Sequence, residues 1–155
     1  MLIYFGADHR GFELKEQLKN YVNDLGYEIY DAGNDRYDEG DDYTEFAAAV
    51  GQGVGRDPEG SKGVLVCGSG AGVVVTANKF LGVRAAQAVN ADQVYEAKRD
   101  DDINILCIAA DFANENDAKE MVKNFLETKF DEKERHVRRL RKIDEIEEQN
   151  FVPRY

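Results

Sequence analysis

The sequence is poor in cysteine and in basic residues, and it has no long apolar run. Its two cysteines do not show the spacing of a disulfide framework or a zinc site. Acidic residues outnumber basic ones by 31 to 20, and the formal net charge of −11 argues against a general nucleic-acid-binding protein. No apolar run approaches the roughly 20 residues that cross a bilayer. We therefore expect no nucleic-acid partner and no membrane association.

The N-terminal segment is apolar but short. Asp8 and His9 interrupt it before the core of a secretory signal forms, so we expect a cytoplasmic protein. The 155 residues suffice for one domain with a substantial core, and no internal repeat or low-complexity linker divides them. We therefore expect a single domain over residues 1–155.

Apolar strand-like runs alternate with helical patterns along the chain. Strands are expected at 2–6, 27–30, 63–67, 83–89 and 103–109. Helices are expected over about 14–25, 44–50, 73–80, 92–99, 114–126 and 132–149. The second helix is expected to weaken at Gly51, Gly53 and Gly55. Because the strands are nearly continuous apolar runs joined by helices, the pattern predicts a parallel sheet with helices on both faces.

The segment 63–72, Gly-Val-Leu-Val-Cys-Gly-Ser-Gly-Ala-Gly, combines a buried strand, a thiol and a glycine-rich turn. The strand ends at Cys67, and the turn that follows it has few side chains before the next helix. Backbone N–H groups at such a turn can face an anion, and the partial positive charge at a helix start favours the thiolate form of a nearby cysteine. The segment therefore predicts a base or nucleophile beside an anion-binding turn.

Other chemically active residues follow strands at the same edge of the predicted sheet. Asp8 and His9 follow the first strand, and Asp111 follows the fifth. Because ligands of parallel sheets bind beyond the carboxyl ends of the strands, one crevice can collect these residues together with Cys67. Cys107 lies inside an apolar strand, where we expect it to pack in the core.

A basic segment interrupts the acidic composition near the end of the chain. Residues 135–142 read Arg-His-Val-Arg-Arg-Leu-Arg-Lys, and such a run is ordinarily a solvated helix face paired with neighbouring carboxylates. Arg135 and Arg139 are four residues apart and share one helix face, where they can hold one phosphate group together. We expect the other arginines and the lysine of this segment to stay on the solvated face.

Several candidates also have purely structural interpretations. Cys67 alone can be core packing, and Asp8 with His9 can cap a helix. Tyr43 lies at the start of a predicted helix, so it is either part of the capping context or a residue that lines a sugar. The three consecutive carboxylates at 100–102 point in different directions, so we expect a solvated turn there rather than a metal site.

Motifs spread over nearly the whole chain, from Ile3 to about Glu148, occur in one order and at characteristic intervals. They are Gly6–Lys15, Asp42-Tyr43, Cys67–Gly72, Ala77–Phe80, Gly82–Ala85, Asn104 and Arg135-His136 with Arg139. With these motifs the chain resembles the family of ribose-5-phosphate isomerase B and galactose-6-phosphate isomerase. The resemblance implies a Rossmann-like three-layer α/β/α sandwich with a five-stranded parallel sheet and an extended C-terminal helix. It also implies a homodimer or dimer of dimers, in which the helix at about 132–149 packs on a partner and the active site lies between subunits.

The resemblance implies aldose–ketose isomerisation of a sugar phosphate through a cis-enediol, without a metal or cofactor. The most direct form is the interconversion of ribose 5-phosphate and ribulose 5-phosphate. Cys67 matches the general base that moves a proton between C1 and C2. Ser69 matches a residue that assists proton movement between the sugar oxygens, and Asp8 matches one that holds or opens the sugar ring.

The same resemblance implies two kinds of substrate-binding residue. Backbone N–H groups of the turn would stabilise the enediolate, at Gly68, Gly70, Ala71 and Gly72. The phosphate would be bound by three side chains, of which the arginines come from the partner subunit: His9, Arg135 and Arg139.

Two aspartates depart from the family pattern. Asp100 stands at the histidine of the His-Asn pair that many relatives have, a histidine that assists ring opening, and Asp111 stands where relatives often have an arginine near the phosphate. Asp101, which follows Asp100, is a candidate substrate-binding residue. An aspartate is mostly ionised at neutral pH, so Asp100 can accept a proton from a ring hydroxyl but is a poor proton donor. A carboxylate at position 111 would repel a phosphate.

These departures leave alternatives open. The substrate can be a different pentose, tetrose or hexose phosphate, or the chain can be a catalytically silent or split-site subunit that assembles with an active paralogue. A phosphate- or nucleotide-binding doubly wound module is the alternative from another class. It is disfavoured because the glycine-rich turn lacks the Lys-Ser end of a Walker motif.

Overall fold

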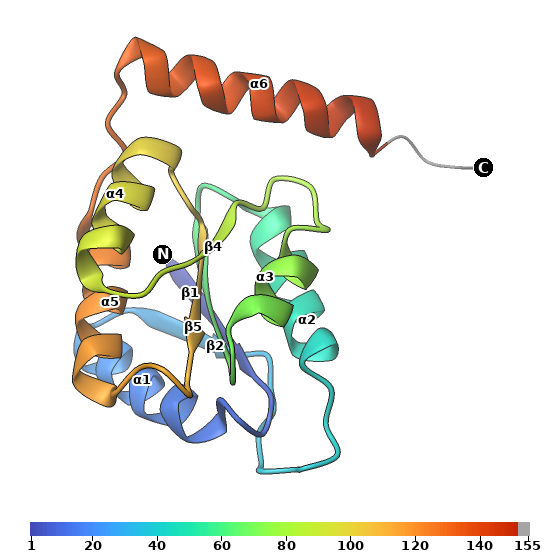
Figure 1. Cartoon of the computed structure of the whole chain (residues 1–155), viewed down its shortest axis with the longest axis vertical. Coiled ribbons are helices and arrows are strands. Elements are labelled where there is room, and N and C mark those ends of the chain that lie inside the picture. The colour runs from blue at the N-terminus through green and yellow to red at the C-terminus, as the bar shows by residue number, and fades with distance from the viewer. Residues whose placement is uncertain (152–155) are drawn as a thin grey trace.

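The computed structural model describes residues 1–151 and shows a parallel sheet between two layers of helices (Figure 1). The strands are β1 (Leu2–Ala7), β2 (Glu28–Asp31), β3 (Ser61–Cys67), β4 (Ala85–Gln87) and β5 (Ile105–Ala109). Their order in the sheet is β2-β1-β3-β5-β4, and all four pairings are parallel. The helices are α1 (Phe12–Asp24), α2 (Tyr43–Arg56), α3 (Ala71–Ala77), α4 (Ala91–Asp101), α5 (Glu115–Glu127) and α6 (Glu134–Asn150).

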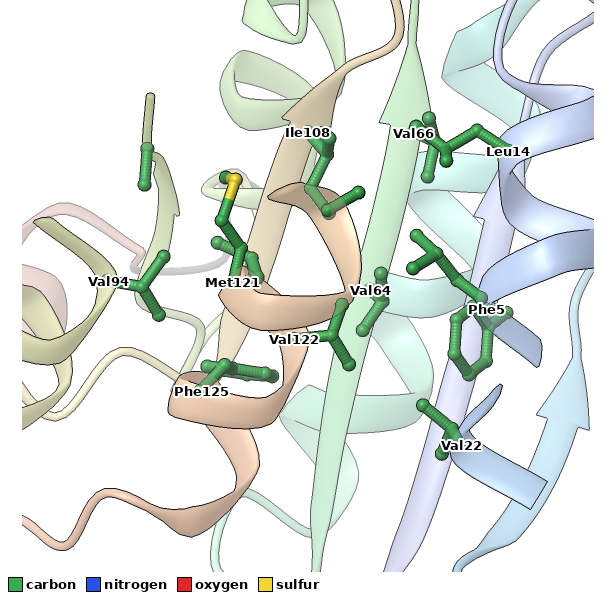
Figure 2. Close-up of a cluster of buried hydrophobic side chains, with 14 of the residues drawn as sticks. Phe5, Leu14, Val22, Val64, Val66, Val94, Ile108, Met121, Val122 and Phe125 are labelled. Carbon is green, nitrogen blue, oxygen red and sulfur yellow. The ribbon is translucent and has the colours of Figure 1, made fainter. Parts of the chain in front are cut away.

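Two buried clusters lie on opposite faces of the sheet, because alternate residues of a strand point to opposite sides. Figure 2 shows the first cluster, where Val64 of β3 packs with side chains of α1, α4 and α5 such as Leu14, Val94 and Phe125. Leu65 and the neighbouring Cys67 belong to the second cluster, with side chains of α2 and α3. The predicted three-layer α/β/α sandwich with five parallel strands is therefore confirmed.

The glycines of α2 do not end the helix, and the expectation that it weakens after residue 50 is wrong. The helix continues to Arg56. A Cβ at Gly51 would lie 2.6 Å from the ring of Phe80, and one at Gly53 would lie 2.6 Å from the ring of Tyr4. The missing side chains therefore let two aromatic rings pack directly against the helix backbone, and this packing offsets the low helix propensity of glycine.

The fourth strand is shorter than predicted, because asparagine side chains organise the segment around it. β4 covers three residues rather than 83–89. The Asn78 amide exchanges two hydrogen bonds with the backbone of Ala85, at 2.9 and 2.8 Å. Asn104, which is fully buried, accepts from the Arg84 N–H at 2.8 Å and donates to the Gly82 carbonyl at 2.7 Å. Two of the residues that carry the family resemblance thus act as structural clamps.

Helix α6 lies across the end of the molecule that is opposite α1 and projects away from the sheet (Figure 1). It has two anchors in the chain. His136 near its start is buried against the end of α4, and the Glu147 carboxylate accepts two hydrogen bonds from the Gly82 N–H at 3.1 and 3.0 Å. Ile143 and Ile146 remain exposed on it. Among the helices described within residues 1–151, none has the length and apolar character needed to cross a membrane.

Candidate active site

The glycine-rich turn wraps around the thiol of Cys67. This side chain ends β3 and is 4% exposed, and its Sγ accepts a hydrogen bond from the Gly70 N–H at 3.2 Å. Gly70 has a φ of 75°, in the left-handed region that favours glycine, and this conformation turns its N–H back toward the sulfur. The Ala71 N–H donates to the Ser69 Oγ at 3.4 Å. The turn therefore places a thiol, a hydroxyl and oriented backbone donors within a few residues.

Three side chains lie directly against the glycines of this turn. A Cβ at Gly68 would overlap the Arg10 guanidinium, and one at Gly72 would lie 2.6 Å from the Tyr43 ring. A third contact comes from Gln87 at the end of β4, whose Nε2 donates to the Ser69 carbonyl at 2.9 Å. A cation, a phenol and an amide thus surround the turn, and this places Tyr43 beside the predicted site.

Asp8 and His9 follow β1 at the same edge of the sheet. Asp8 is 6% exposed, and its Oδ1 accepts from the Gly11 N–H at 3.1 Å, so it caps the turn that precedes α1. The His9 Nδ1 lies 2.8 Å from the Asp41 Oδ1, which also accepts from the His9 N–H at 3.0 Å. The hydrogen bond to Asp41 raises the pKa of His9 above its ordinary value. His9 therefore holds its proton more firmly than a free imidazole, as an anion-binding residue requires.

A buried lysine fixes the loop that carries Asp41. Lys15 of α1 is fully buried, and its Nζ donates to the two Asp31 carboxylate oxygens at 2.9 and 3.0 Å and to the Asn34 carbonyl. The Asn34 side chain donates to the second carboxylate oxygen of Asp41 at 3.2 Å. The polar contacts thus run from Lys15 through Asn34 and Asp41 to the imidazole of His9, and Asp31 is a second partner of Lys15.

Asp111 lies at the site and is paired with Arg10, a residue to which the sequence motifs assign no role. The Arg10 Nη2 donates to the Asp111 Oδ2, and the Asp111 N–H donates to the Gly68 carbonyl at 3.1 Å. The charge that was expected to repel a phosphate is therefore offset by a neighbouring guanidinium. A hollow of about 220 Å³ opens beside Ser69 and Gln87, and the exposed ring of Phe112 lines it.

The remaining predicted site residues lie at the other edge of the sheet. Asp100 and Asp101 end α4 just before β5 begins, at the amino ends of the strands, whereas Cys67 lies at the carboxyl ends. Helix α6 starts at this amino edge, where the Arg135 Nε donates to the His136 Nε2 at 3.2 Å. Arg139 follows one turn further along the same helix. One chain therefore brings together only part of the predicted site.

The solvated turn expected at 100–102 is wrong, because α4 continues through Asp101 and the carboxylates on either side of that residue are paired. The Asp100 Oδ1 accepts from the Arg99 Nε at 2.7 Å and lies 3.7 Å from the His136 Nε2. Asp102 forms ion pairs with Arg84, at 3.1 Å, and with Lys98. The hydrogen bond from Arg99 holds the pKa of Asp100 below its usual range, so this carboxylate is ionised at neutral pH.

The comparisons with known proteins agree with this architecture. The model of the Ribose/Galactose Isomerase family matches residues 3–143. Ribose-5-phosphate isomerase B of Mycobacterium tuberculosis is 33% identical over 153 residues, which cover 99% of this chain and 94% of the relative. This chain belongs to the ribose/galactose isomerase family. The family resemblance in the sequence is thereby confirmed.

Solved structures of isomerases from this family superpose on the chain closely. Ribose-5-phosphate isomerase B from Mycoplasma genitalium with bound ribulose-5-phosphate is 32% identical with a TM-score of 0.93, covering 96% of this chain and 97% of that one. Type B ribose 5-phosphate isomerase from Trypanosoma cruzi is 34% identical with a TM-score of 0.91, covering 97% and 100%. The ribose/galactose isomerase fold thus extends over nearly the whole chain.

Sequence reasoning missed three residues that shape this candidate site. Arg10 stands within the Gly6–Lys15 motif, but nothing in the sequence shows that its side chain lies on Gly68 rather than in solvent. Asp41 is one of several aspartates in an acidic loop, and only the structure selects it as the partner of His9. Gln87 lies in a short strand with no recognisable motif.

Proposed function

We propose that this chain interconverts ribose 5-phosphate and ribulose 5-phosphate, and that Cys67 is the general base. The observation that carries the proposal is the geometry of Cys67: a buried thiol at the carboxyl end of β3, held by the Gly70 N–H and enclosed by the glycine-rich turn. Transfer of a proton between C1 and C2 needs one group that both accepts and returns it. A thiol that reaches the edge of the sheet meets this requirement.

The mechanism uses the two sides of the turn differently. Cys67 removes the proton from C2 of the aldose and returns it to C1, while Ser69 assists proton movement between the oxygens on these carbons. The negative charge of the enediolate is stabilised by backbone N–H groups from Gly68 to Gly72, and preorganised donors of this kind contribute roughly 2.7–4 kcal/mol each. Asp8 holds the ring oxygen or hydroxyl during ring opening.

The phosphate is bound away from the reacting carbons, where its binding energy orients the sugar. His9 contributes from the carboxyl edge of its own chain, and its raised pKa supports this role. Arg135 and Arg139 lie at the amino edge, so they reach a Cys67 site only from a second copy. We propose a homodimer or dimer of dimers, in which residues 1–155 form one isomerase domain and α6 packs on the partner.

Asp100 and Asp101, at the end of α4, enter the site from the same partner chain as the two arginines of α6. The Asp100 carboxylate is ionised and half-buried, so its role is to accept a proton from a ring hydroxyl rather than to protonate the ring oxygen. Ring opening then depends on a different acid for the ring oxygen. We place this reaction in the cytoplasm, where its phosphorylated sugars occur.

The test is a panel of sugar phosphates offered to the purified full-length chain, with ribose 5-phosphate, ribulose 5-phosphate and galactose 6-phosphate among them. The expected result is isomerisation of ribose 5-phosphate, with loss of activity in Cys67→Ala. A preference for galactose 6-phosphate would overturn the proposed substrate but would leave the proposed isomerisation mechanism in place. No turnover of any sugar phosphate by a folded homodimer would support the silent-subunit alternative instead.

A further inference from the structure

Arg10 occupies a place that the reaction above does not explain. Its guanidinium lies against the backbone of Gly68, the residue that follows Cys67, so closely that a Cβ on Gly68 would overlap it. It is also paired with the Asp111 carboxylate, and the Asp111 N–H donates to the Gly68 carbonyl at 3.1 Å. Arg10, Gly68 and Asp111 therefore form one unit that joins the ends of β1, β3 and β5.

The pairing leaves most of the guanidinium donors available to a ligand. An arginine carries five N–H donors, and among the described residues Asp111 is the ion-pair partner of Arg10. The Arg10 side chain is 52% exposed, so its remaining donors are accessible to a ligand, and Arg10 lines a hollow together with His9 at the carboxyl edge of the sheet. A planar fork of donors matches the oxygens of a phosphate group.

We propose that Arg10 is a substrate-binding residue that contacts the phosphate of the sugar phosphate. Asp111 is its positioning residue, which holds the guanidinium over Gly68. The proposal rests on the proposed function and specifies how this chain recognises its anionic substrate. It also explains why a carboxylate at position 111 is compatible with phosphate binding: the Asp111 carboxylate is paired with the Arg10 guanidinium and orients it.

The alternative is that Arg10 and Asp111 form a surface ion pair with no role in binding. Exposed ion pairs contribute little to folding. Arg10→Gln is therefore expected to unfold at nearly the wild-type temperature under either interpretation, so a change in its kinetics reports on the site. Arg36→Gln is the matched control, because Arg36 is an exposed arginine on the loop at the same edge of the sheet.

The experiment measures kcat, KM for ribose 5-phosphate and the inhibition constant of inorganic phosphate. Arg10→Gln is expected to raise KM and the inhibition constant by about 10–100-fold, the range for a lost charge-assisted hydrogen bond, with a smaller change in kcat. Arg10→Lys should recover part of the loss, and Arg36→Gln should match wild type. A fall in kcat with unchanged KM and phosphate inhibition would overturn the proposal, as would equal effects of Arg10→Gln and Arg36→Gln.

A charge exchange tests the positioning role of Asp111. Arg10→Asp alone removes the cation, and Asp111→Arg alone places two guanidinium groups side by side, so each should raise KM. The double variant restores an ion pair over Gly68 and is expected to have a lower KM than either single variant. If the fold-increase in KM of the double variant equals the product of the two single fold-increases, the two residues act independently. That result would refute the proposal that Asp111 positions Arg10.

Failure of the proposed function is distinguishable from failure of this inference. If the wild-type chain turns over no ribose 5-phosphate, binding of inorganic phosphate is followed by line broadening in ³¹P NMR spectra. Broadening by wild type that is lost in Arg10→Gln and kept in Arg36→Gln supports the role of Arg10 without any isomerase activity. Equal broadening in both variants refutes it.

Discussion

Replacing Lys15 by methionine tests whether a buried ion pair holds the loop beside the active site. Lys15 is fully buried, and its Nζ contacts both oxygens of Asp31 at 2.9 and 3.0 Å as well as the Asn34 carbonyl. Methionine keeps the length and apolar stem of the side chain but removes the charge and every hydrogen bond.

The expected loss of stability depends on how well the Asp31 carboxylate remains paired after the substitution. Removing one partner of a buried ion pair costs about 3–5 kcal/mol. Asp31 still accepts hydrogen bonds from Lys19 and from the Gly33 N–H, so its charge is not left unpaired. We therefore expect the low end, about 3 kcal/mol, which is a more than hundredfold change in the folding equilibrium and lowers Tm by roughly 6–12 °C.

Lys19→Met is the matched control, because Lys19 pairs with the same carboxylate from a partly exposed position. Its loss should be at most about 1 kcal/mol. Urea unfolding measures both variants, and KM for ribose 5-phosphate reports on His9, which Lys15 supports through Asn34 and Asp41. Equal stability losses in the two variants would refute the reasoning from burial. An unchanged KM in Lys15→Met would refute the link to His9.

Three further predictions concern single residues of the site and core. Cys107→Ala should lower stability by about 1 kcal/mol and leave kcat/KM unchanged, since burial raises the pKa of this thiol and keeps it out of the chemistry; a large loss of kcat would contradict this. Gly68→Ala should raise KM, because a Cβ would displace the Arg10 guanidinium; an unchanged KM would contradict the contact. The pKa of His9 is raised, so we expect its ion pair with Asp41 and its binding of phosphate to be fully formed below about pH 6.5. Both should weaken as the pH rises through the raised pKa of His9. If the dependence of KM on pH is the same in His9→Gln as in wild type, the effect is excluded.

The fold was readable from the sequence because the central strands β1, β3 and β5 are largely apolar and the helices between the strands carry apolar stripes. The errors came from tertiary contacts that local pattern does not show. Gly53 weakens a helix in isolation, but here it lets the Tyr4 ring pack on the backbone. The pattern predicts that the fourth helix stops at Arg99, yet α4 continues through Asp101, and the aspartates at 100 and 102 have basic partners.

The part of the site that lies in one continuous sequence motif was predictable, namely Cys67 at the end of its strand and the glycine-rich turn that follows it. Partners from distant segments were not predictable. Nothing local links Arg10 to Asp111, which are 101 residues apart, or His9 to Asp41 across a polar loop. These pairs arise because β2, β1, β3 and β5 lie side by side in that order in the sheet and end at one edge.

The most direct test of the central claim is the exchange of sugar protons with solvent. Ribose 5-phosphate is incubated in deuterated water with wild type, Cys67→Ala or Cys107→Ala, and deuterium at C2 of the aldose and C1 of the ketose is followed by NMR. A general base contributes about 10²–10⁴-fold. We predict that Cys67→Ala slows exchange by this factor and that Cys107→Ala matches wild type. Exchange at the wild-type rate in folded Cys67→Ala would contradict the account.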